Sequence, residues 1–191
     1  MNAYDVIRDV HRIGSPMAGT VSHRTDLTIL HGFPSGHLTL DTTSEFRAIL
    51  PFAHLTDDHK SFSPELIPNV GDRLETVVFN FVEDTLYLSA RPSDLKRSTI
   101  QEWQDFYAYV DTLSPGMEVM GVVERVEPFG LFVNIGSPYI GLIDIGHTAF
   151  NRGHALPYDN SEWPQVGDRI RCVLGYVRFH TRQIGLGWLP D

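Results

Sequence analysis

The sequence predicts an all-β protein with two small five-stranded barrels in tandem, joined by one amphipathic helix. Three observations support this fold class. Short apolar runs with period-two alternation recur along the chain and are separated by Gly, Pro and other turn residues. One stretch near the middle has clear helical spacing instead. Two pairs of segments repeat at offsets of 93 and 96 residues, which indicates a duplicated structural unit.

The first half, residues 1–94, is expected to form the first barrel. Residues 1–13 have a loosely helical apolar spacing that predicts a short lead-in helix. Strands are then expected at 19–21, 27–30, 38–40, 46–50, 74–81 and 86–88. Strands at this spacing, with turn residues between them and no long helices, are typical of a sandwich or a barrel.

The repeat favours the barrel. Residues 68–74 (PNVGDRL) align with 164–170 (PQVGDRI), and residues 46–54 (FRAILPFAH) align with 139–147 (YIGLIDIGH). Two barrels of the same type are the simplest explanation.

Residues 95–113 are expected to form the linker helix. Ser98 and Gln101 have the spacing of a capping box. Apolar side chains follow at helical spacing at Ile100, Trp103, Phe106 or Tyr107, Val110 and Leu113. Such a stripe usually packs on a neighbouring structure.

The second barrel is expected over residues 114–191. Phe129 and Phe132 bracket Gly130, where a glycine allows a sharp bend and leaves room for a flat ligand. The spacing is compatible with a stacking platform and equally with two aromatic residues of the barrel core.

Residues 115–188 resemble the ribosomal S1 (S-one) RNA-binding domain, a five-stranded barrel of the oligonucleotide-binding (OB) fold. The matching motifs are Gly121 with Val123, Phe129-Gly130-Leu131-Phe132, Gly141-Leu142-Ile143 and Val166-Gly167-Asp168. The resemblance implies that Phe129 and Phe132 stack on unpaired bases of single-stranded RNA.

Other positions depart from the family pattern. Asp144 replaces the family's histidine at the end of the third strand, and Arg178 and Gln183 replace the aspartate and arginine around the last turn. The resemblance therefore predicts that Asp144 and Arg178 face one another on the binding surface and form an ion pair, which would contribute little to stability if it is largely exposed. Arg178 and Arg182 are expected to contact RNA, and the long loop 146–164, with Arg152, is expected to add contacts. Aligned through Gly36 and Gly130, the first copy has Ser35 and Leu38 at the platform positions.

Composition limits the function. The net charge is −9; residues 1–95 hold 7 Lys and Arg against 13 Asp and Glu, and residues 96–191 hold 8 against 11. Strong sequence-independent phosphate binding is therefore not expected. The sequence has no P-loop, no G-x-S-x-G and no C-x-x-C, so neither an enzyme nor a cofactor is predicted. Cys172, the single cysteine, is expected to be a core residue.

His54, Asp57, Asp58 and His59 are the best metal candidates, but a loop whose polar residues cap turns is favoured there, and no metal site is predicted. No signal peptide or membrane span is expected, which predicts a cytoplasmic protein.

Two functions are compatible with these features. The first is a non-catalytic protein that binds single-stranded RNA through the second barrel, in translation or RNA handling, with the first barrel as scaffold. The alternative is an acidic protein-binding module that has kept the fold without the RNA affinity, such as an inhibitor, an immunity-type protein or a partner of a ribosome or a nuclease.

Overall fold

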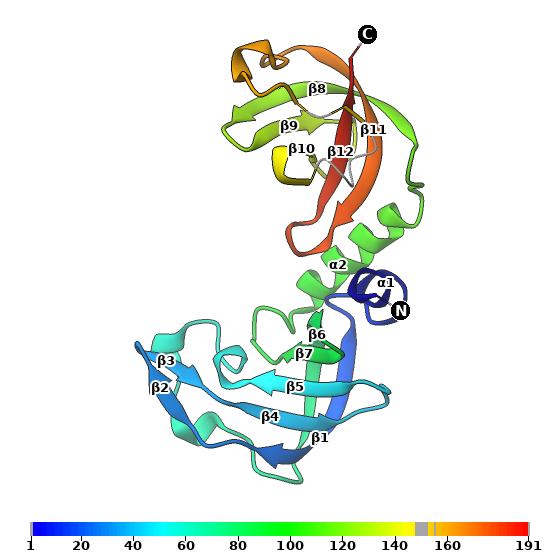
Figure 1. Cartoon of the computed structure of the whole chain (residues 1–191). Helices are drawn as coiled ribbons and strands as arrows, with labels where there is room; N and C mark the ends of the chain where they lie inside the picture. Colours follow the sequence, from blue (N-terminus) through cyan, green and yellow to red (C-terminus); the bar gives the residue numbers. More distant parts are fainter. Residues whose placement is uncertain (1, 148–152, 155, 191) are drawn as a thin grey trace. The chain divides into compact units, whose positions relative to one another are not determined.

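The structure is a computed structural model that describes residues 2–147, 153–154 and 156–190 (Figure 1). The chain divides into two compact units, Met1–Asp105 and Phe106–Asp191. Each unit contains one closed five-stranded barrel, so the predicted all-β tandem fold is confirmed. The boundaries expected at residues 94 and 114 stay a prediction.

The first barrel has the strand order β1-β4-β5-β7-β6. Its strands are β1 (Pro16–Arg24), β4 (His37–Asp41), β5 (Arg47–Pro51), β6 (Arg73–Val82) and β7 (Thr85–Ser89). Alternate residues of β4 point inward, so Leu38 and Leu40 are buried with Leu50 and Leu86 in the barrel core. Closure leaves this sheet without a free edge.

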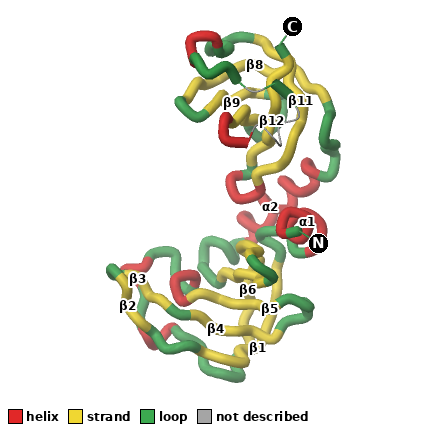
Figure 2. Tube along the Cα trace, viewed as in Figure 1, coloured by secondary structure: helices red, strands yellow, loops and turns green. Residues whose placement is uncertain are grey.

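A separate hairpin interrupts the first barrel between β1 and β4 (Figure 2). It consists of β2 (Thr28–Leu30) and β3 (Phe33–Ser35), which pair only with each other. His31 and Gly32 both have positive φ angles, of 51° and 84°, as a two-residue type I′ turn requires. The expectation that residues 27–30 contribute to the barrel is therefore wrong. A short apolar run predicts a strand but does not determine which strand it pairs with.

The second barrel has the strand order β10-β12-β11-β8-β9. Its strands are β8 (Glu118–Glu127), β9 (Gly130–Asn134), β10 (Gly141–Asp144), β11 (Arg169–Arg178) and β12 (Gln183–Leu189). β10 and β12 are parallel, as are β5 and β7 in the first barrel, and the other neighbours are antiparallel. Cys172 is buried in β11, as expected, and burial raises the pKa of its thiol to about 12.

The two barrels share irregular details as well as strand order. The pairing of β1 with β4 shifts register after Val21, and that of β8 with β9 shifts after Val123. Val21 O accepts a 2.8 Å hydrogen bond from Gly71 N, and Val123 O accepts a bond of the same length from Gly167 N. Bulges are local features that chance similarity does not reproduce. The internal repeat is therefore confirmed in three dimensions.

The helix α2 spans Arg97–Val110 and contributes side chains to both units. In the first unit, Gly14 lies directly against the Trp103 ring. In the second, Phe106 contacts the Tyr139 ring at 4.9 Å between centroids, and Tyr107 stacks on Phe179 at 5.4 Å. Because the helix begins at Arg97, Ser98 lies inside its first turn, and the predicted capping position is wrong.

The remaining helical segments are short. α1 (Ala3–Asp5) continues into a π-helical turn, Val6–Val10, at the expected lead-in helix. The 3₁₀ turns are Phe52–His54, His59–Ser61, Pro64–Leu66, Ile145–His147, Asn160–Glu162 and Phe179–Thr181. Within the described residues, no helix is long and apolar enough to cross a membrane.

Candidate functional site

The start of β9 positions the two candidate aromatic residues. Phe129 is 47% exposed, whereas Phe132 is only 9% exposed. Their rings meet edge to face, with centroids 5.9 Å apart. Phe129 therefore presents its ring to solvent, whereas the ring of Phe132 is largely covered by neighbouring side chains.

Gly130 makes this arrangement possible. Its φ angle is 151°, and a Cβ atom at this position would lie 2.0 Å from the Ile143 carbonyl oxygen. Real Cβ atoms do not approach an oxygen so closely, so only glycine allows β9 to pair with β10 at this point. The close approach of Gly130 to the Ile143 carbonyl therefore fixes the backbone next to Phe129.

Arg125 covers the Phe132 ring and was not predicted from the sequence. Its guanidinium carbon lies 4.0 Å from the ring centroid, and its Nε lies 3.3 Å from Glu127 Oε1. Arg125 and Phe132 are opposite each other across β8 and β9, directly after the register shift at Val123. This contact follows from the register in which β8 pairs with β9, and the periodicity of the sequence does not predict that register. The result is a layered surface in which a planar cation lies on an aromatic ring.

Asp144 and Arg178 form the predicted ion pair, at 3.4 Å between Oδ2 and Nη1. The pair is only partly exposed, because Asp144 is 8% exposed and the Arg178 side chain is 31% exposed. Its Oδ1 accepts a 2.7 Å hydrogen bond from Gly146 N, so the carboxylate also holds the turn after β10. Both charges act on the nearby Tyr176, whose pKa is raised mainly by burial. An aspartate whose charge is balanced by a paired arginine repels phosphate less than an unpaired aspartate.

The two remaining predicted contact residues are Arg182 and Arg152. Arg182 lies at the end of the turn between β11 and β12, with a left-handed φ of 50°. Arg152 lies outside the described residues.

In the first barrel, other residues occupy the positions that correspond to Phe129 and Phe132. Phe52 N donates to Gly36 O at 3.0 Å, and Ile145 N donates to Phe129 O at 3.1 Å, so Gly36 is the counterpart of Phe129. Thr39 is the counterpart of Phe132 by the same register, because β4 pairs with β5 as β9 pairs with β10.

The positions expected from alignment through the glycines, Ser35 and Leu38, are therefore wrong by one residue. The reason is that Gly36 and Gly130 relieve different contacts, the Phe52 ring in one barrel and the Ile143 carbonyl in the other. The interpretation that the first barrel lacks an aromatic platform is unchanged, since Gly36 and Thr39 are not aromatic either.

The metal candidates do not converge. His54 Nδ1 lies 3.1 Å from the Leu88 carbonyl, and Asp57 accepts hydrogen bonds from Ser93. Burial, and then the Arg91 charge, lower the pKa of His54. Among the described residues, no group of three or more His, Cys, Asp or Glu side chains is arranged to hold a metal ion.

Comparison with known proteins identifies the second barrel. Residues 112–187 match the sequence model of the family described as S1 RNA binding domain. The matched residues contain strands β8 to β11 of the second barrel and most of β12. The resemblance expected from the strand motifs is thereby confirmed, and the S1 domain supports a nucleic-acid-binding role for this part of the chain.

The chain is also similar to the uncharacterized protein YitL of Bacillus subtilis, with 26% identity over 166 residues and 87% of this chain. It spans only 41% of the length of that curated relative.

Two solved structures show similarity as well. The uncharacterized protein MJ1198 of Methanocaldococcus jannaschii is 29% identical, with 41% of this chain and 95% of that one covered and a TM-score of 0.32. A multidomain protein with nucleic acid binding domains from Streptococcus pneumoniae is 15% identical, with 100% and 54% covered and a TM-score of 0.29.

Proposed function

We propose that this protein binds single-stranded RNA through its S1 domain, without catalysis, and acts in the cytoplasm in translation or RNA handling, with the first barrel as scaffold. The observation that carries the proposal is the exposed ring of Phe129, which contacts Phe132, together with the Arg125 guanidinium that lies over the Phe132 ring. An aromatic face and a guanidinium plane both stack on unpaired bases, and neither requires a particular base.

The charges at this surface favour stacking over phosphate binding as the source of affinity. Arg125 is paired with Glu127, and Arg178 is paired with Asp144. These ion pairs partly neutralise the two cations, in a chain whose net charge is −9. Because few counterions are then released on binding, we expect a shallow dependence of affinity on salt.

The test is a titration of the full chain with a fluorescent single-stranded RNA at about 50 and about 200 mM salt. The expected result is saturable binding to the single strand, with no comparable binding to a duplex of the same sequence. An absence of binding at the lower salt concentration would contradict the proposal.

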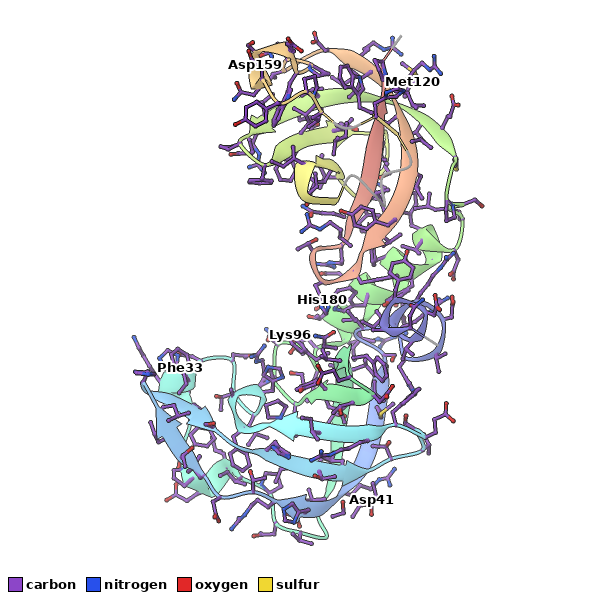
Figure 3. The ribbon with its side chains drawn as sticks, in the orientation of Figure 1. Phe33, Asp41, Lys96, Met120, Asp159 and His180 are labelled. Atoms are coloured by element: carbon purple, nitrogen blue, oxygen red, sulfur yellow. The ribbon has the colours of Figure 1, made fainter. Side chains whose placement is uncertain are left out.

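A second candidate function rests on the hairpin β2–β3 of the first barrel. Ile29, Leu30 and Phe33 are exposed there, and Phe33 can be seen at the hairpin in Figure 3. Exposed apolar side chains gathered on one small element are typical of protein-binding surfaces. Saturable binding of a protein partner that is lost in Ile29→Ser with Leu30→Ser, together with no RNA binding by the full chain, would favour this function.

A further inference from the structure

An apolar groove lies directly beside Phe129 in the S1 domain. It has a volume of about 720 Å³, and its walls include Pro128, Ile145, Leu156, Pro157 and Tyr158. Pro128 immediately precedes Phe129, and Ile145 N donates a 3.1 Å hydrogen bond to the Phe129 carbonyl. Two residues of the groove wall are therefore attached directly to Phe129, one by a peptide bond and one by a backbone hydrogen bond.

The far wall is held in place before any ligand arrives. Trp163 is buried, and its indole N–H donates a 2.7 Å hydrogen bond to the Pro157 carbonyl across the base of the turn. Leu156 is buried as well, and Asp159 accepts a 2.9 Å hydrogen bond from Ser161 N, which starts the short 3₁₀ turn. The labelled Asp159 marks this segment in Figure 3. Between these anchors the Tyr158 side chain is fully exposed. A fixed backbone that presents a fully exposed aromatic ring loses little conformational entropy on binding.

We propose that this groove binds a further unpaired nucleobase of the RNA strand that stacks on Phe129, with Tyr158 as a second stacking residue. The inference rests on the proposed function and extends it, because nothing in the family motifs includes Tyr158. The groove has the features of a base site, namely apolar walls and an exposed aromatic ring, and one of its walls is Pro128, the residue next to Phe129.

The charges of the groove exclude phosphate as its occupant. None of the described residues that line it is Lys or Arg, and Asp159 and Asn160 are its polar members. Hydrogen bonds from the Ser161 backbone and side chain lower the pKa of Asp159, so its carboxylate is ionised at neutral pH and repels phosphate. The same carboxylate and the Asn160 amide can accept hydrogen bonds from the N–H groups on a base edge.

The test compares single variants of the full chain in titrations with one fluorescent single-stranded RNA at several salt concentrations. Tyr158→Ala is expected to weaken binding by about 5- to 150-fold, the loss of one stacked base, without changing the salt dependence. Tyr158→Trp is expected to keep the native affinity. Phe33→Ala removes an exposed aromatic residue of the first barrel and serves as the matched control, with no expected effect.

The outcomes separate this inference from the proposed function. If Phe129→Ala weakens binding and Tyr158→Ala does not, the groove inference is overturned and the proposed function stands. A changed salt dependence in Tyr158→Ala would also overturn it, because stacking releases no counterions. If the native chain binds no RNA at all, both fail together.

Discussion

Phe129 and Phe132 lie three residues apart, yet the structure predicts opposite consequences when each is replaced by alanine. Phe129 is 47% exposed, so Phe129→Ala leaves almost no cavity and is expected to change stability by less than about 1 kcal/mol. It removes a stacking surface worth about 1–3 kcal/mol per base, and RNA binding is expected to weaken by about 5- to 150-fold.

Phe132→Ala is expected to act mainly on folding. The side chain is 9% exposed, and truncation of a buried phenylalanine costs about 3–5 kcal/mol. Loss of the Arg125 contact adds about 0.5–1 kcal/mol. In a unit of this size, each 1 kcal/mol lowers the melting temperature by about 4–8 °C, so a fall of at least about 12 °C is expected.

The assay is thermal unfolding of both variants, followed by RNA titration well below the lower melting temperature. Phe132→Leu is a useful third variant, because it keeps an apolar side chain at this covered position and removes the ring that Arg125 covers. Equal destabilisation by Phe129→Ala and Phe132→Ala would refute the reasoning, since it depends on their difference in burial. So would native RNA affinity in Phe129→Ala.

Three further predictions concern the residues around this surface and one histidine of the first barrel. Asp144→Asn leaves Arg178 without its carboxylate partner. We expect the free energy of unfolding in urea to fall by about 1–3 kcal/mol, between the values for exposed and buried pairs. RNA binding is expected to become tighter and to depend more steeply on salt. Unchanged affinity would show that nucleic acid is not bound near this pair. Gly130→Ala is expected to destabilise by more than about 3 kcal/mol, whereas Gly136→Ala, which also has a positive φ but open space around it, should cost only about 1–2 kcal/mol; similar costs would mean that the Ile143 contact is unimportant. Burial lowers the pKa of His54 below its ordinary value of 6.5, so the stability that its neutral form contributes is present above about pH 6.5 and is lost as the pH falls through the lowered pKa. Urea unfolding between about pH 7.5 and about pH 5 should show this loss, and His54→Gln should reduce it; an unaltered pH profile in the variant would contradict the assignment.

The sequence was sufficient to predict what repeated, regular patterns encode. Alternation within strands and the repeated Val-Gly-Asp turns at residues 70–72 and 166–168 predicted two barrels, because both signals are local. The Asp144–Arg178 pair was predicted from their positions in the family pattern, and the distance of 3.4 Å confirms it. Its burial was not predicted, because exposure depends on the turn that follows β10 and not on the two residues themselves.

Features that depend on how strands pair could not be predicted from the sequence. The contact between Arg125 and Phe132 exists because the register shifts after Val123, and alternation read along one strand does not reveal a shift relative to its neighbour. The same limit explains why Ser35 and Leu38 were chosen in place of Gly36 and Thr39. A single misplaced residue moves every side chain to the other face of a strand.

The helix α2 limits where this protein can be divided into fragments that fold. Its side chains enter two cores: Trp103 packs against Gly14, whereas Phe106 and Tyr107 contact Tyr139 and Phe179. A fragment that starts at residue 114 would leave the aromatic surface around Phe179 uncovered, and one that ends at residue 94 would uncover the surface at Gly14. The boundary between the two units falls inside this helix, so a recombination or an expression boundary preserves both units only if the helix is copied into each fragment.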